Sequence, residues 1–377
     1  MKSRIVILGA GFAGLELSTS LSEALGENAG VTVIEKGESF AFGFSKLDVM
    51  FGRASASSVA LPYRDFRKPG VQLRRETVTA IDPRGRRVTT DAGTHDTDIL
   101  VIALGADYDV SGTPGITLGV NEFYSMAGAA HLAGVIPTFT RGHAVIGICG
   151  APFKCPPAPS ECALLLHDEL SRRGVRGDCH ITLVHPLPSP VPPSPEMSRA
   201  LLAEFGAKNI DFVPDRRVTS VDAARRAITL DDGRELPCDL FLGVPKNRAP
   251  DVVVAAGMAE NGWVKVDPRT LETPHPGVYA LGDLANTGAP KAGVFSETAA
   301  RVVAANILST LRGETPTARN PGAGSCYVEL GEGRISRVDV DFFSGPKPTG
   351  TYQEPSLALR ADKDAFGATR RARWFGR

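Results

Sequence analysis

The sequence predicts an α/β protein built from two Rossmann-like dinucleotide-binding domains, the second nested in the first, with a small C-terminal module. Three observations predict this fold class: an N-terminal strand, glycine loop and helix; a hairpin-and-strand pattern that occurs twice; and a length of 377 residues, enough for two or three domains. Hydrophobic residues make up 42% of the chain and charged residues 22%, as is typical of a globular protein.

The N-terminus carries a nucleotide-binding pattern. A β-rich segment, R-I-V-I-L, precedes Gly9-x-Gly11-x-x-Gly14, and a helical pattern follows. Gly9 suits the tight turn, Gly11 lets the backbone approach a pyrophosphate, and Gly14 permits close packing of helix on strand. The next predicted strand, 31–34, leads into Glu35, which is placed to accept a hydrogen bond from a ribose hydroxyl. We therefore expect a dinucleotide at this loop.

Two later segments favour FAD as this dinucleotide. Residues 98–106, D-I-L-V-I-A-L-G-A, form a predicted buried strand that ends in small residues around Gly105, and residues 277–283 end in Gly282-Asp283. They resemble the later cofactor contacts of flavoproteins with two dinucleotide folds, in which the aspartate holds the ribityl chain. FAD is extended and needs such distant contacts, whereas NAD does not. The alternative for Asp283 is a simple turn residue.

An internal echo predicts the second domain. Residues 87–101 and 227–241 share a pattern of hairpin, Asp/Gly turn and buried strand, which suggests two related α/β units. We expect an FAD-binding domain at 1–110 and 239–315, a second Rossmann-like domain at 111–238, and a C-terminal module at 316–377.

The second domain lacks a phosphate loop of its own. Its predicted first strand, 143–150, is followed by A-P-F-K-C-P-P-A-P instead of a glycine fingerprint. Proline lacks the N–H donor with which a loop cradles phosphate. The following strand ends in His185-Pro186, without an acid for an adenosine ribose. Bound NAD is therefore disfavoured at this position.

Composition excludes several other classes of protein. Lys+Arg and Asp+Glu are equal at 42 each, so we expect no nucleic-acid partner. The 6 cysteines include no Cys-x-x-Cys spacing, and we expect no metal site. No apolar run approaches the ~20 residues of a membrane span. Because the first strand already carries the nucleotide motif, we expect no signal peptide and a cytoplasmic protein.

Three segments resemble one family of flavoproteins. K-C-P-P-A-P-S-E (154–161) resembles the segment that holds the active cysteine in the flavin subunit of flavocytochrome c sulfide dehydrogenases, and the related sulfide:quinone oxidoreductases carry a cysteine at the same place. A-P-K-A-G-V-F-S-E (289–297) resembles the start of that family's flavin-facing helix. S-C-Y-V-E-L-G-E-G (325–333) resembles its C-terminal cysteine segment. The resemblance implies the glutathione-reductase-like arrangement of two domains.

The resemblance also implies roles for particular residues. Cys155 and Cys326 would form a redox disulfide beside the flavin, which sulfide or another soft sulfur nucleophile would attack. Glu161 would transfer the proton, and Lys291 would stabilise the reduced flavin ring. Elementary chemistry agrees, because thiol–disulfide exchange requires a thiolate and Lys154 beside the cysteine would lower its pKa. An acid nearby would move the proton, and positive charge near the flavin would tune its potential.

Each of these residues also has a simpler interpretation. Cys155 and Cys326 would then be inert packed cysteines, and Cys162 competes with Cys326 as the partner of Cys155. Glu161 would be an acid that suits the first turn of a helix, and Lys291 a solvated lysine.

The resemblance leaves the electron acceptor open between a quinone and a carrier protein. The alternatives from other classes are an NAD(P)H-dependent flavoprotein, of the type II NADH dehydrogenase or carrier-protein reductase kind, and a flavin-binding redox sensor without turnover. The C-terminal A-T-R-R-A-R-W-F-G-R either rests on an anionic membrane, giving a peripheral location, or docks on the chain's own body. The chain alone leaves monomer and homodimer open.

Overall fold

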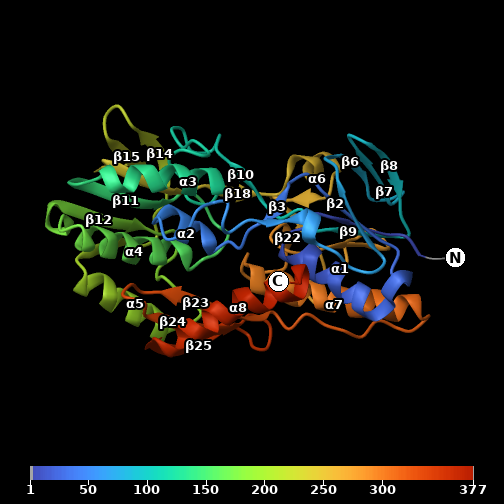
Figure 1. Cartoon of the computed structure of the whole chain (residues 1–377). Helices are drawn as coiled ribbons and strands as arrows, with labels where there is room; N and C mark the ends of the chain where they lie inside the picture. The colour runs from blue at the N-terminus through green and yellow to red at the C-terminus, as the bar shows by residue number, and fades with distance from the viewer. Residues whose placement is uncertain (1–2, 377) are drawn as a thin grey trace.

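The computed structural model describes residues 3–376 and shows two α/β domains side by side, with a third layer beneath them (Figure 1). The first domain holds a five-stranded parallel sheet in the order β21-β9-β1-β2-β5. Its strands are β1 (Ile5–Leu8), β2 (Val31–Glu35), β5 (Val71–Arg75), β9 (Ile99–Ile102) and β21 (Val278–Ala280). The central strands β1 and β9 are buried along their whole length, as expected for a parallel sheet covered on both faces.

The second domain repeats this plan with a four-stranded parallel sheet in the order β13-β12-β11-β17. Its strands are β11 (Gly142–Ile148), β12 (Cys179–Val184), β13 (Ile210–Val213) and β17 (Leu240–Val244). Because β17 pairs with β11 in this sheet, the boundary expected at residue 238 lies one strand too early. The chain crosses between the domains on an antiparallel pair, β10 (Asp107–Asp109) and β18 (Lys246–Arg248).

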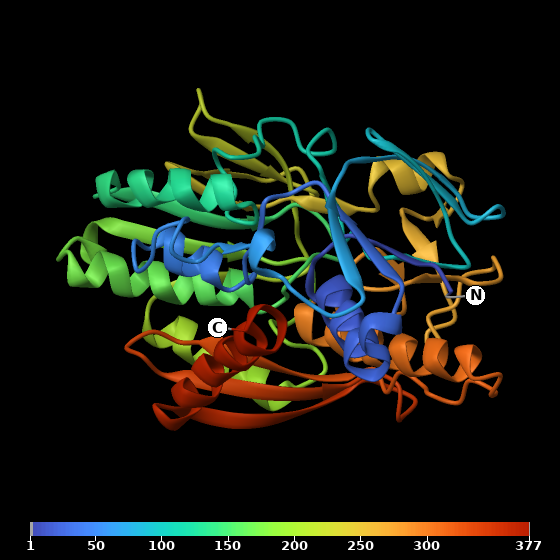
Figure 2. The same cartoon turned by 45° about the vertical axis from the view of Figure 1, so that its right-hand side comes forward.

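The internal echo of the sequence corresponds to a repeated structural unit. Residues 87–101 contain the end of a three-stranded antiparallel sheet and then β9, and residues 227–241 contain the same sheet end and the start of β17. The two small sheets project from the same side of the two domains (Figure 2). They are β6 (Val78–Asp82), β7 (Arg87–Thr90) and β8 (Gly93–Asp96), and β14 (Val218–Asp222), β15 (Ala227–Leu230) and β16 (Glu235–Pro237).

Helices cover the faces of both parallel sheets, and α7 packs directly against α1. Their bounds are α1 (Phe12–Leu25), α2 (Ser45–Met50), α3 (Met126–Val135), α4 (Ala158–Arg172), α5 (Pro195–Ala207), α6 (Asp251–Ala255) and α7 (Gly293–Leu311). The remaining short strands are β3 (Ser39–Phe40), β4 (Leu61–Pro62), β19 (Ala259–Glu260), β20 (Trp263–Lys265) and β22 (Ala285–Asn286).

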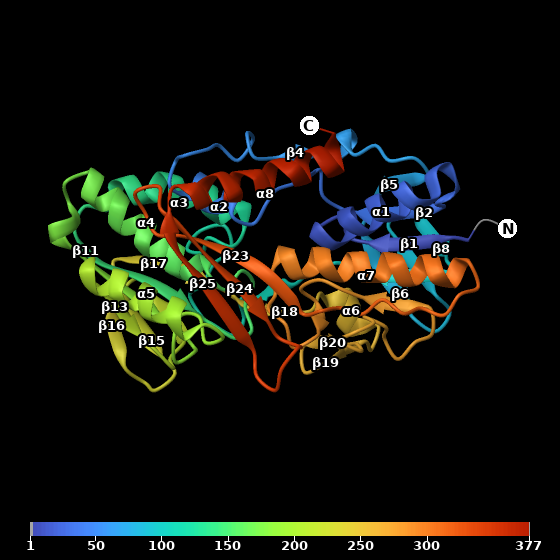
Figure 3. The same ribbon diagram turned by 90° about the horizontal axis from the view of Figure 1, so that it is seen from below.

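The C-terminal module links the two domains. Its antiparallel sheet, β23 (Ala323–Glu329), β24 (Ile335–Asp341) and β25 (Thr349–Ser356), shares its apolar core with the second domain. The last helix, α8 (Ala358–Phe375), then runs back across the molecule to the first domain (Figure 3). Trp374 and Phe375 at its end belong to the core of the first domain, so that α8 contacts both domains.

A buried carboxylate anchors the end of α8. Glu16 on α1 is fully buried, and its Oε2 accepts hydrogen bonds from the Trp374 indole N–H at 2.8 Å and from Arg373 Nε at 2.9 Å. Arg301 of α7 donates to Oε1 of the same carboxylate at 2.8 Å. Burial opposes ionisation of Glu16, but these donors hold its pKa below the ordinary value. Of the two alternatives for the basic-aromatic tail, the structure shows docking on the chain's own body.

Replacing Trp374 with alanine should destabilise the protein by about 3–5 kcal/mol, because loss of the fully buried indole leaves a cavity among Phe12, Phe40 and Phe42 and removes one hydrogen bond to the Glu16 carboxylate. Urea unfolding followed by far-ultraviolet circular dichroism measures the change. Arg371→Ala on the exposed side of α8 is the matched control and should leave the midpoint unchanged. Equal midpoints for the two variants would contradict the anchoring role.

Candidate active site

The residues that the sequence assigns to the cofactor and to the thiols meet at one cavity of 320 Å³ between the two domains and the C-terminal module. Its wall contains Gly11, Gly105, Gly282, Asp283 and Lys291 from the first domain, Cys155 and Glu161 from the second, and Cys326 from the module. Gly9 and Gly14 lie outside this wall, in the loop after β1 and in α1, and Glu35 lies outside it at the end of β2.

Steric contacts explain two of the three fingerprint glycines. A Cβ on Gly9 would lie 2.5 Å from the Ala103 carbonyl oxygen, and one on Gly14 would lie 1.9 Å from the Gly9 carbonyl oxygen. A Cβ on Gly11 would meet nothing within 4 Å, so this position faces open space. No side chain caps the N-terminus of α1, and its free N–H groups therefore point toward the place where a pyrophosphate would bind.

Glu35 shapes the nucleotide loop from the end of β2. Its Oε2 accepts from the Ala10 N–H at 2.9 Å and its Oε1 from the Gly37 N–H at 2.8 Å. Tyr63 donates its hydroxyl to the Ala10 carbonyl at 2.8 Å. Glu35 therefore fixes the conformation of the loop. Its carboxylate oxygens keep further lone pairs, so the ribose contact predicted for Glu35 is still possible.

Asp283 supplies a direct test of whether this cavity fits FAD. Its Oδ1 is buried, and within residues 3–376 it has no hydrogen-bond partner. A buried, unpaired carboxylate oxygen is costly unless a donor reaches it, and the hydroxyls of a ribityl chain are such donors. Gly105 and Gly282 on the same wall have φ of +70° and +84°, which suits glycine. The residues present therefore fit the flavin end of FAD.

The cysteine loop is fastened to the FAD-binding domain by its backbone. The Cys155 N–H donates to the Lys291 carbonyl at 2.8 Å, across a β-bridge between Lys154 and Lys291. Cys155 itself has φ of +50°, a left-handed conformation that residues with a Cβ rarely adopt. This strained turn begins three residues before α4 and directs the chain into the helix on which Glu161 lies.

Cys326 lies on β23 and is the second cysteine of the cavity wall. Both cysteines are free thiols in this structure. Cys162, the alternative partner from the sequence, is fully buried in the core of the second domain and does not contribute to the wall. Cys149, Cys179 and Cys238 are also buried away from the cavity. The structure therefore places Cys155 and Cys326 on the wall of the same cavity.

The thiol pKa values differ from the sequence-based expectation. Burial raises the pKa of Cys155 to about 12, with a further contribution from the charge of Glu161, and burial likewise raises that of Cys326 to about 12. The expectation that Lys154 lowers the Cys155 pKa is wrong. The Lys154 ammonium instead donates to the Ala106 carbonyl at 2.8 Å and lies 4.1 Å from the Tyr108 ring centroid.

Lys46 is the cation that opposes this rise in the Cys155 pKa, and sequence reasoning did not identify it. It lies on α2, lines the cavity, and its charge lowers the Cys155 pKa. Burial lowers the pKa of Lys46 itself, while Cys155, Glu122 and Asp283 oppose that change. The segment around Lys46 matches no motif, and only the fold brings it to the cysteine.

Lys291 is buried beneath the cavity wall and is not a solvated lysine. Its ammonium donates to the Asp283 carbonyl at 2.6 Å and lies 3.5 Å from the centroid of the Trp263 ring. Burial lowers its pKa to about 8, and the charge of Asp283 counteracts this. Its contact with the flavin stays a prediction.

Glu161 projects from the first turn of α4 and is only 3% exposed. Burial raises its pKa, and Lys363 and the Glu329 N–H oppose the rise. Its Oε1 accepts from that N–H at 3.0 Å and lies 3.7 Å from Lys363 Nζ. A buried carboxyl with a raised pKa beside two thiols has the properties of a group that accepts and returns a proton.

Two buried aromatic rings pack together at the carboxyl ends of β11 and β12 in the second domain. Phe153, directly after β11, packs edge-on against His185 at the end of β12 with ring centroids 5.9 Å apart. Both side chains are buried, at 4% and 1% exposure. Ligands of open α/β sheets bind at these carboxyl ends of strands. The packing of the two rings agrees with the missing phosphate loop.

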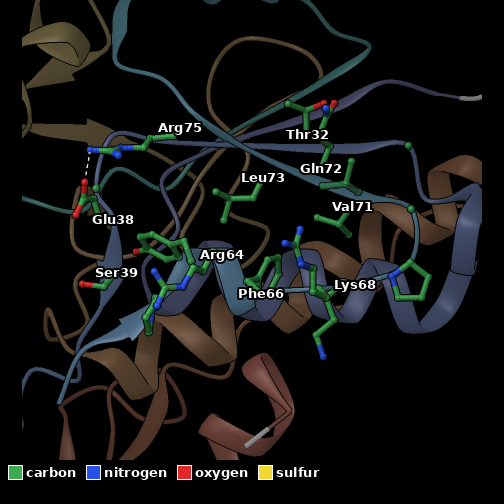
Figure 4. A pocket seen from close by; sticks show the side chains of 18 of the residues that line it. Thr32, Glu38, Ser39, Arg64, Phe66, Lys68, Val71, Gln72, Leu73 and Arg75 are labelled. Atoms are coloured by element: carbon green, nitrogen blue, oxygen red, sulfur yellow. Dashed lines mark ion pairs between the residues drawn. The ribbon is translucent and has the colours of Figure 1, made fainter. Parts of the chain in front are cut away.

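A separate surface groove of 1320 Å³ runs along the edge strand β5 (Figure 4). It is lined by charged side chains such as Arg64 and Lys68 and by an Arg75–Glu38 ion pair of 2.6 Å. None of the predicted catalytic residues lies in it. Size alone therefore does not identify the active site, and the cavity with the cysteines is the better candidate.

Comparisons with known proteins agree with the fold and the cavity, which together define an FAD-dependent oxidoreductase. Residues 3–305 match the family described as pyridine nucleotide-disulphide oxidoreductase, and the chain belongs to this family. The resemblance found in the sequence is confirmed by relatives that cover most of the chain.

The mitochondrial sulfide:quinone oxidoreductase of Schizosaccharomyces pombe is 26% identical over 86% of this chain and 78% of its own length. The sulfide-quinone reductase of Aquifex aeolicus is 24% identical over 91% of this chain and 83% of its own length. The solved sulfide:quinone oxidoreductase structure from A. aeolicus shares the fold, with a TM-score of 0.84, 22% identity, and coverage of 97% of this chain and 89% of that one.

The type II NADH:quinone oxidoreductase of Staphylococcus aureus matches a smaller part, with 32% identity over 30% of this chain and 29% of its own. Within residues 3–376, no helix combines the length and the apolar character needed to cross a bilayer.

Replacing Asp283 with leucine should weaken FAD binding about ten- to hundredfold, because it removes a charged hydrogen-bond acceptor worth about 1.5–3 kcal/mol. The measurement is the ratio of flavin to protein absorbance after gel filtration, together with titration of the apoprotein with FAD. Asp251→Asn, on an exposed aspartate outside the cavity, is the control. Full FAD retention by Asp283→Leu would contradict the assigned contact.

Alkylation of reduced Cys155 by iodoacetamide should rise about tenfold per pH unit from pH 7 to pH 10 without levelling off, because a thiol with a pKa of about 12 is almost wholly protonated over this range. Mass spectrometry of the Cys155 peptide measures the rate. Lys46→Met should slow the reaction further, since it removes a charge that favours the thiolate. Levelling below pH 9 would show an ordinary, unburied thiol.

Proposed function

We propose that the protein oxidises hydrosulfide, or a similar soft sulfur nucleophile, through a redox disulfide between Cys155 and Cys326, and passes the electrons to a quinone. One observation carries this proposal: two cysteines from different parts of the chain line the same cavity as Gly11, Gly105 and Asp283 of the FAD site. The named activities of the relatives in S. pombe and A. aeolicus support it.

The chemistry begins with the oxidised pair. Hydrosulfide attacks one sulfur of the Cys155–Cys326 disulfide, a new S–S bond forms to that cysteine, and the other cysteine leaves as a thiolate. Lys46 provides the positive charge that helps to stabilise a thiolate at Cys155, against the cost of burial. A second sulfur nucleophile then takes the outer sulfur of the resulting persulfide and leaves both cysteines as thiols. FAD, when bound, supplies the two-electron acceptor that re-forms the disulfide from these thiols.

Glu161 is the proton acceptor of this reaction. In its carboxylate form it accepts the S–H proton of the incoming sulfur, and the rise that burial imposes on its pKa makes it a stronger base for this transfer. Asp283, another carboxyl on the cavity wall, faces Lys46, Lys154 and Lys291, whose charges favour its carboxylate form.

The acceptor side of the proposal rests on an aromatic wall. Phe366 of α8 lies against Phe44 and Tyr327, with ring centroids 6.3 Å and 6.5 Å away, and all three line the cavity. A flat, apolar quinone ring fits such a wall better than the charged surface of a carrier protein does.

The NAD(P)H-dependent alternative has support from the partial similarity to the S. aureus enzyme. The packing of Phe153 against His185 argues against it, because these rings stand where a nicotinamide dinucleotide would enter the second domain.

Anaerobic stopped-flow reduction of the bound flavin separates these possibilities. We expect rapid bleaching by sulfide, slow bleaching by NADH and NADPH, and at least a hundredfold loss of the sulfide rate in Cys155→Ser and Cys326→Ser, since each lacks one sulfur of the disulfide. Cys179→Ser, at the start of β12 and outside the cavity, is the matched control.

Steady-state turnover with sulfide and a soluble quinone then tests the acceptor and excludes a redox sensor that has no turnover. Fast reduction by NADH that survives both cysteine substitutions would overturn the proposal.

A further inference from the structure

Glu329 is a buried carboxylate that the proposed reaction does not use. It ends β23, three residues after Cys326, and is only 4% exposed. Arg53 contacts its Oε1 at 2.5 Å and its Oε2 at 3.2 Å, and Lys363 Nζ lies 3.1 Å from Oε2. Arg360 lies 3.8 Å away at the rim of this cluster, and Asp48 pairs with Arg53 at 3.0 Å.

The cluster is joined directly to Glu161. The backbone N–H of Glu329 donates to Glu161 Oε1, and Lys363 Nζ faces both carboxylates, at 3.1 Å from Glu329 and 3.7 Å from Glu161. The two carboxylates therefore share the Lys363 ammonium, which lies closer to Glu329 than to Glu161. The two carboxyls have opposite environments: burial raises the pKa of Glu161, while Lys363 and Arg53 overcome burial and lower that of Glu329.

We propose that Glu329 and Lys363 act as a positioning pair that sets the protonation of Glu161, so that docking of α8 completes the proton-transfer machinery of the cysteine cavity. This inference rests on the proposed role of Glu161 in sulfur oxidation. Neither residue touches the reacting sulfur in this scheme; both act through Glu161.

Lys363 and Glu329 have opposite electrostatic effects on the ionisation of Glu161. Glu161 faces the charges of Lys363 on α8, Glu329 on β23 and Arg53 after α2, with the thiols of Cys155 and Cys326 on its cavity side. Lys363 favours the Glu161 carboxylate. Glu329 opposes it, both by its own negative charge and by drawing Lys363 and Arg53 to itself.

The position of Lys363 couples this site to the end of the chain. Lys363 lies on α8, whose far end is fixed in the first domain by Trp374 and Glu16. Arg53, Glu161 and Glu329 come from three other segments of the fold. A molecule with α8 undocked would lose the lysine and leave Glu161 and Glu329 as two neighbouring carboxyls, which disfavours ionisation of Glu161.

The test uses the FAD-loaded protein and follows the pH dependence of flavin reduction by sulfide. The rate should rise with pH as Glu161 ionises. Glu329→Gln should move the midpoint of this rise, the ascending limb of the pH profile, about one pH unit lower, because the Glu329 carboxylate then no longer competes with Glu161 for Lys363 and Arg53. Lys363→Met should move it about one unit higher. Glu329→Asp retains the charge and should restore the limb toward the wild-type position.

Lys68→Met is the matched control, because Lys68 also contacts α8, through the Arg373 carbonyl at 2.5 Å, but lies outside the cavity. It should leave the limb in place. Shifts in the same direction for Glu329→Gln and Lys363→Met, or no shift in either, would overturn the proposal and leave the cluster a purely structural one.

An infrared titration distinguishes failure of this inference from failure of the proposed function. The carbonyl band of the protonated Glu161 carboxyl, identified by its loss in Glu161→Gln, reports the same midpoint without any sulfide. Opposite shifts of this band in Glu329→Gln and Lys363→Met support the positioning pair even if sulfide does not reduce the flavin. An unmoved band contradicts the pair even if sulfide oxidation is fast.

Discussion

The hydrogen bond from the Cys155 N–H to the Lys291 carbonyl is the contact on which the arrangement of the active site depends. It joins the strained turn that begins the second domain's helix to the segment that follows Asp283 in the first domain. A buried backbone hydrogen bond is costly to break, and the left-handed conformation of Cys155 needs surrounding contacts to persist. Together they hold a thiol at the wall of the FAD cavity.

Burial is the second constraint, because the cavity contains more ionisable groups than an apolar interior tolerates without pairing. Asp283 is surrounded by Lys46, Lys154 and Lys291, whose charges oppose the rise that burial imposes on its pKa. Near the thiols, Lys46 favours ionisation of Cys155, but burial keeps both Cys155 and Cys326 protonated. The site thus separates a cluster of charged groups around Asp283 from a nearly neutral thiol pair, and Glu161 interacts with both the thiols and Lys363.

The C-terminal module completes the active-site cavity that lies between the two domains. Its sheet packs on the second domain and carries Cys326, while its helix packs on the first and carries Lys363 and Phe366. The ion-pair network at Glu16 and the buried Trp374 fix the far end of that helix. A change of the docking of α8 would therefore alter the thiol pair's surroundings and the aromatic wall at the same time.

Much of the fold was predictable because its signals are local. The glycine fingerprint, the buried strands and the repeated hairpin depend on residues close in sequence, and they placed Gly9 and Gly11 in a loop before α1 and Gly14 in the first turn of that helix. The end of the second domain was misplaced because β17 reads like any buried strand, and its membership of a sheet depends on its pairing with β11.

The sequence by itself determined that this is a flavoprotein of two nucleotide-binding folds with an unusual cysteine loop, because glycine spacing, apolar runs and prolines act on their immediate neighbours. Only the tertiary structure decided which cysteine lines the same cavity as Cys155, that Lys46 and not Lys154 favours its thiolate, and that Glu329 and Lys363 lie beside Glu161. These outcomes depend on burial and on charges from distant segments, and such long-range terms leave no pattern along the chain.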